Sequence, residues 1–74
     1  MTREIANIRK AILDQKKPFC QIDLFNRLER DYAITDREAI LDVLDELFNI
    51  GLVEYKFVGK TKNNLPGYAY VVVV

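Results

Sequence analysis

The chain has 74 residues, 50% of them hydrophobic and 11% aromatic, and this length allows a single domain over residues 1–74. The composition excludes a disordered segment, and 11 basic residues balanced by 11 acidic ones exclude a strongly basic nucleic-acid coat. The absence of histidine and the single cysteine exclude an intrachain disulfide, a zinc site of the usual type and a histidine-based catalytic triad.

Residues 2–16 are predicted to form the first helix. Apolar side chains recur there at helical spacing, and Thr2 is suited to the N-cap. Pro18 ends the helix because proline disfavours helical geometry at the residue before it. The apolar positions are Ile5, Ile8, Ile12 and Leu13.

The next segment begins with a short apolar stretch, residues 19–21, which is typical of a brief strand or a β-bridge. We expect Cys20 to be buried in it as a small apolar side chain. Residues 22–30 then predict a second, short helix with one apolar side. That side consists of Ile22, Phe25 and Leu28, with Leu24 beside them.

Residues 35–49 predict the third helix. The sequence TDRE at residues 35–38 matches a capping box, in which the Thr35 hydroxyl and the Glu38 carboxylate each bond a backbone N–H. Gly51 follows at the position where a helix C-terminus favours a left-handed residue. The apolar stripe consists of Ile40, Leu44 and Leu47, with Leu41 and Phe48 beside them.

After Gly51 the apolar pattern changes from helical to alternating, which predicts a strand from Val53 to Phe57. A polar loop over residues 59–67 and a β-branched, aromatic strand over residues 68–74 complete a hairpin. With residues 19–21 the hairpin would form a three-stranded sheet. The predicted core is Ile5, Ile8, Ile12, Phe25, Leu28, Ile40, Leu44, Leu47 and Val53.

This order of elements resembles the winged helix-turn-helix fold. The resemblance is carried by the second helix and its tight turn (residues 22–34), the capped third helix, and the sequence LDELFNIGLVE over residues 44–54. It implies an α+β fold with three helices, a short strand and a C-terminal hairpin, the wing. In winged-helix DNA-binding proteins the third helix enters the major groove, and the wing contacts the DNA backbone or the minor groove.

The outer face of the third helix departs from this pattern. A period of 3.6 residues turns four polar side chains outward with Glu46 beside them, and Arg37 is the helix's one basic residue. An acidic face would be repelled by DNA phosphates. Basic residues exceed acidic ones in the other two parts of the chain. Residues 1–20 hold five bases and two acids, and residues 52–74 hold three bases and one acid, whereas residues 21–51 hold three bases and eight acids. The outward side chains are Glu38, Asp42, Asp45 and Asn49.

The first functional hypothesis is a DNA-binding or transcription-associated regulator whose wing leads the contact with double-stranded DNA. Lysine and asparagine side chains bind phosphate oxygens, although the same residue types are common in solvated loops. The candidate nucleic-acid-binding residues are Arg37, Lys56, Lys60, Lys62 and Asn63.

The alternative hypothesis is a protein–protein interaction module. The acidic face would dock a basic partner, or it is a solvated surface. Apolar residues on both faces of residues 68–74 favour cover by a second copy, hence a homodimer, or packing under the first helix. The candidate acidic residues are Glu38, Asp42, Asp45 and Glu46.

Both hypotheses describe a binding protein without catalytic residues, cofactor or metal. We expect no signal peptide, because the N-terminal residues carry both charges and lead into no long apolar run, and the longest apolar run is far shorter than a membrane span. We therefore expect a cytoplasmic protein that does not enter a membrane.

Overall fold

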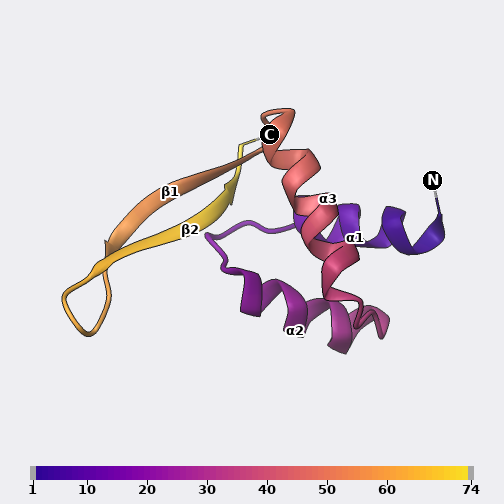
Figure 1. Cartoon of the computed structure of the whole chain (residues 1–74), viewed down its shortest axis with the longest axis horizontal. Helices are drawn as coiled ribbons and strands as arrows, with labels where there is room; N and C mark the ends of the chain where they lie inside the picture. Colours follow the sequence, from indigo (N-terminus) through magenta and orange to yellow (C-terminus); the bar gives the residue numbers. More distant parts are fainter. Residues whose placement is uncertain (1, 74) are drawn as a thin grey trace.

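The computed structural model describes residues 2–73 and shows an α+β arrangement. The three helices gather at one end, and a two-stranded hairpin extends from them toward the other end of the 40 Å long axis (Figure 1). Within the described chain the elements are α1 (Arg3–Leu13), α2 (Gln21–Tyr32), α3 (Arg37–Asn49), β1 (Val53–Lys60) and β2 (Pro66–Val72).

The core lies between the three helices and the start of the hairpin. Of the nine predicted core residues all but Ile5 are buried. Ile5 is 36% exposed because the N-terminal turn of α1 projects past its crossing with α3 (Figure 1). Ile22, which was predicted on the apolar side of α2, is 57% exposed. Leu24 is buried instead, because it lies four residues before the buried Leu28 and residues four apart share a helix face. The fully buried large side chains are Ile8, Ile12, Leu24, Leu28, Ile40, Leu44, Leu47 and Val53.

The helix ends follow the predicted caps in two of three cases. The Thr2 Oγ1 accepts a hydrogen bond from the Ile5 N–H at 3.1 Å, which confirms Thr2 as an N-cap. The predicted capping box of α3 is wrong, because Asp36 is the N-cap and its Oδ1 accepts from the Ala39 N–H at 3.1 Å. Gly51 has φ +85°, as its position after α3 predicted.

The end of α2 carries a strained residue, Ala33, at φ 56°. The Ala33 N–H donates to the Glu29 carbonyl, which is the 5→1 hydrogen bond of the αL motif, and the Ile34 N–H donates to the Leu28 carbonyl. Alanine pays a steric cost in the left-handed region that glycine avoids.

Ala33→Gly is therefore expected to raise the free energy of unfolding by about 0.5–1 kcal/mol, because relief of the left-handed alanine outweighs the entropy that glycine adds to the unfolded chain. A urea titration followed by circular dichroism measures the change. Ala6→Gly, in the interior of α1 and exposed, is the matched control and should lower the same quantity. A loss of stability in both variants would contradict the assignment of strain to Ala33.

The sheet contains two antiparallel strands, not the three predicted. β1 pairs with β2 in a register that places Tyr55 opposite Tyr70, and a bulge interrupts the ladder between Phe57 and Gly59. Phe19 contributes only an isolated bridge to Tyr70. The strands are longer at the tip than expected, which leaves a turn over residues 61–65, and the predicted end of the second strand, Val74, lies outside the described residues.

Candidate binding surface between α3 and the hairpin

The predicted DNA-contacting residues of the hairpin divide into two groups. Lys60, Lys62 and Asn63 lie together and exposed at the tip, and neither lysine forms an ion pair with another residue between positions 2 and 73. Lys56 lies in the middle of β1, where its Nζ is 2.9 Å from Glu54 Oε2. The positive charge of Lys56 is therefore partly neutralised, and the basic group is confined to the tip.

The fifth predicted residue, Arg37, does not join this group. It begins α3, and the hairpin follows the opposite end of that helix (Figure 1). Its guanidinium lies over the Phe25 ring, 4.9 Å from the ring centroid, in a cation–π contact. The five predicted residues thus form no continuous basic face.

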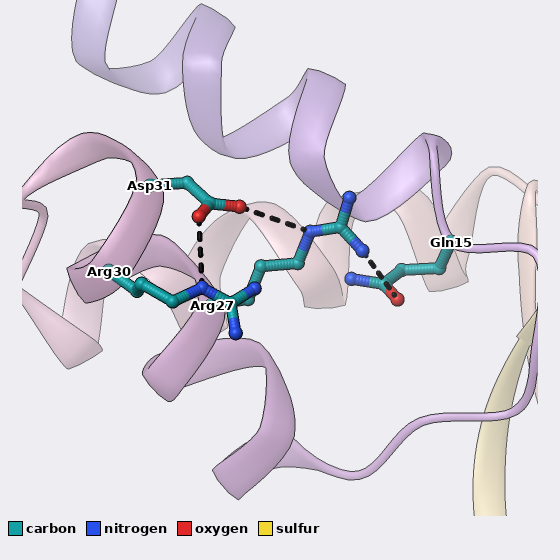
Figure 2. Close-up of polar contacts among 4 residues, drawn as sticks. All are labelled: Gln15, Arg27, Arg30 and Asp31. Atoms are coloured by element: carbon teal, nitrogen blue, oxygen red, sulfur yellow. Dashed lines mark hydrogen bonds and ion pairs between the residues drawn. The ribbon is translucent and has the colours of Figure 1, made fainter.

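The arginines of α2 are also engaged (Figure 2). Arg27 donates to the Gln15 Oε1 at 3.4 Å and lies 3.7 Å from Asp31, which also pairs with Arg30 at 3.0 Å. The hydrogen bond from Arg30 lowers the pKa of the Asp31 carboxyl below its ordinary value. These contacts hold α2 against the segment after α1. Because the cluster contains charges of both signs, it forms no basic surface.

The predicted acidic face of α3 is present for three of its four residues. Glu38, Asp42 and Asp45 are exposed on the outer side of the helix, as the 3.6-residue period predicted. Glu46 turns toward α1 instead, where its Oε1 lies 3.6 Å from Arg9 Nη2. Of the three outward carboxylates, Asp45 lies nearest the hairpin, since it lines a cavity with Tyr55.

An aromatic surface that the sequence did not predict covers one face of the hairpin. The strand register stacks the rings of Tyr55 and Tyr68 with centroids 5.5 Å apart, and Tyr70 and Phe57 continue the row at 4.9 and 5.9 Å. Phe19 joins it to the core through Tyr70 at 5.8 Å. Tyr55 and Phe57 remain 53% and 57% exposed, so most of the row faces solvent.

This aromatic row and α3 border a cavity of about 320 Å³, which we call the α3–hairpin groove. Its walls are apolar, with Leu41 and Phe48 on α3 facing Tyr55 and Tyr70 on the hairpin, and Asp45 supplies a carboxylate. At the start of α2 the Gln21 Nε2 donates to the Tyr70 hydroxyl at 3.3 Å, which holds one wall in place. An open groove with aromatic walls and one carboxylate can bind an apolar side chain next to a cation.

The alternating aromatic residues of both strands were the sequence signal for this groove. The alternation of Val53, Tyr55 and Phe57 predicts one apolar face but not what covers it, and the helices cover only the base of the hairpin (Figure 1). The prediction that Cys20 is buried is wrong. Cys20 is exposed because its neighbour Phe19 points into the core.

No cluster of three or more cysteine, aspartate or glutamate side chains that could hold a metal ion occurs among residues 2–73. In the same part of the chain no helix has both the length and the apolar character needed to cross a membrane.

The comparisons with known proteins found no match for this chain. No protein-family model matches the chain, and no curated protein or solved structure matches it significantly.

Proposed function

We propose that the chain is a non-enzymatic protein-interaction module of the winged-helix type, which binds a partner protein in the α3–hairpin groove. The partner segment presents a large apolar side chain next to a lysine or arginine. The observation that carries this proposal is the groove itself, where exposed aromatic rings face Phe48 and Asp45 across an open cavity.

The charge on α3 favours a protein over a nucleic acid as the occupant. Glu38, Asp42 and Asp45 are exposed on the face that would approach DNA phosphates, and the last turn of α3 carries no basic residue. A helix C-terminus is itself electronegative, so it adds to the repulsion of phosphate and to the attraction of a cation.

The composition of the groove suits protein recognition. Tyrosine and phenylalanine are enriched at the centres of protein interfaces, where they bury a large area at a small cost in side-chain entropy. Phe48 is 45% exposed on a rigid helix, and Tyr55 is held by rings on either side. Such fixed aromatic side chains are typical of binding hot spots.

Selection of a displayed random-peptide library on the immobilised chain tests the proposal. We expect enriched peptides to carry a large apolar residue beside a basic one. Phe48→Ala is expected to lower the affinity for a synthetic enriched peptide by about tenfold, as measured by fluorescence anisotropy, because it removes a hot-spot ring. Asp45→Asn is expected to abolish the preference for the basic residue while leaving apolar binding.

The matched control is Leu65→Ala, which removes another exposed apolar side chain but lies at the hairpin tip outside the groove. Its peptide affinity should equal that of the original chain. Equal losses for Leu65→Ala and Phe48→Ala, or enrichment of acidic peptides, would contradict binding in the groove.

Wing-led binding of DNA is the second candidate, favoured by the exposed tip residues Lys60, Lys62 and Asn63. Anisotropy with duplex DNA at low and near-physiological salt distinguishes it from the first candidate. Steeply salt-dependent binding that is lost in Lys60→Ala/Lys62→Ala would support it. A single-stranded oligonucleotide belongs in the same series, because exposed aromatic rings also stack on bases.

A further inference from the structure

The outer edge of β1 is a free strand edge in the described part of the chain. β2 has a neighbour on each side, with β1 on one and Phe19 on the other. The Phe19 N–H donates to the Tyr70 carbonyl at 3.0 Å, and the Tyr70 N–H donates to the Phe19 carbonyl at 2.8 Å. β1 has a strand neighbour on one side only, so its other side presents unpaired N–H and C=O groups.

The hydrogen bonds of Tyr70 identify which groups of β1 point outward. Because Tyr70 directs its N–H and C=O toward Phe19, its opposite residue Tyr55 receives no ladder bond from it. The ladder bonds of β1 therefore belong to Glu54 and Lys56, and the Val73 N–H bond to the Leu52 carbonyl continues the same alternation. The N–H and C=O groups of Tyr55 and Phe57 point to the free edge.

We propose that β1 pairs antiparallel with β1 of a second copy of this chain, about a two-fold axis through Tyr55. This proposal rests on the free edge of β1 and not on peptide binding in the α3–hairpin groove. The Tyr55 residues of the two copies exchange both backbone hydrogen bonds, and Phe57 lies opposite Val53 of the partner subunit. The two hairpins then form one four-stranded sheet, which is more stable in water than an isolated two-stranded hairpin.

Charge selects this register. It places Glu54 opposite Lys56 of the partner subunit, twice by symmetry, in non-hydrogen-bonded pairs where side chains lie closest. A shift of the pairing axis by one residue either way places Glu54 against Glu54 or Lys56 against Lys56, both repulsive. Within one copy the two side chains already lie on the same face, with Lys56 Nζ 2.9 Å from Glu54 Oε2.

The aromatic row also favours a second copy as the occupant of this edge. Antiparallel pairing about Tyr55 keeps the aromatic rings of both copies on one face of the enlarged sheet. It buries side chains of Tyr55 and Phe57 that are more than half exposed in the single chain. The bulge after Phe57 ends the regular edge, so the paired segment is short and the dimer is expected to be concentration-dependent.

Sedimentation velocity on four chains tests the proposal: the original, Glu54→Lys, Lys56→Glu and the double swap. The original chain should show a monomer–dimer equilibrium with a dissociation constant below about 1 mM. Each single variant places like charges opposite each other at two positions and should weaken association by about tenfold. The double swap restores opposite charges and should return to within about threefold of the original. A monomeric original chain, or a double swap no stronger than the single variants, would overturn the proposal.

Disulfide formation tests the register itself, in a Cys20→Ser background that removes the exposed native thiol. Tyr55→Cys places a thiol opposite its own copy, at a backbone separation of about 5.5 Å that a disulfide can span. Glu54→Cys is the control, since residue 54 lies opposite residue 56. Mild oxidation should link the Tyr55→Cys chain and leave the Glu54→Cys chain mostly unlinked. Equal linkage, or none at residue 55, would overturn the two-fold axis at Tyr55.

Discussion

Leu47→Ala is expected to lower the free energy of unfolding by about 3 kcal/mol, the typical cost of a large-to-small change at a fully buried site. Leu47 has no exposed surface and packs in the core formed by all three helices. Its carbonyl also accepts the Leu52 N–H at 3.0 Å, so it lies where α3 turns into β1. The free energy of unfolding of a domain of this size is about 4–11 kcal/mol, so the loss is a large fraction of it.

Thermal unfolding followed by circular dichroism should show a fall in midpoint of about 12–24 °C for Leu47→Ala. Phe48→Ala is the matched control, because the two residues are adjacent on α3 and Phe48 is half-exposed in the groove. We expect Phe48→Ala to cost less than about 1 kcal/mol. Similar losses in the two variants would contradict the separation of core and groove faces on α3, and a folded Phe48→Ala also validates its use in the peptide experiment.

The helical part of the fold could be predicted from the sequence because its signals are local. The stripe of Ile40, Leu44 and Leu47 and the glycine after α3 both act within a few residues, and the structure confirms them. The capping residue of α3 was wrong by one position because Thr35 and Asp36 are both good caps, and their backbone geometry decides between them.

The candidate site could be predicted only in part, because it depends on how far the hairpin extends from the helices. The alternation of Val53, Tyr55 and Phe57 identifies one face but not what covers it. Val53 is buried at the base of the hairpin, whereas Tyr55, which lines the groove opposite α3, and Phe57 are both more than half exposed. Likewise the distance of Arg37 from the hairpin tip follows from helix packing, which no local pattern encodes.

Phe19 links the helical core to the hairpin beside the α3–hairpin groove. Its side chain is buried in the core and stacks on Tyr70, and its backbone forms both bonds of the bridge to β2. Tyr70 in turn lines the groove and accepts the hydrogen bond of Gln21. One buried ring thus connects the core to the aromatic row.

Phe19→Ala is therefore expected to lower the free energy of unfolding by about 3 kcal/mol and to accelerate hydrogen exchange of the Tyr70 amide under conditions where the helices stay folded. Urea titration and exchange followed by NMR measure the two effects. Phe19→Leu keeps most of the buried volume and should cost less than about 1.5 kcal/mol. Phe57→Ala, which removes an exposed ring near the tip, should leave the Tyr70 amide protected. Unchanged protection of that amide in Phe19→Ala would show that the hairpin is held by other contacts, and the groove would then not depend on Phe19.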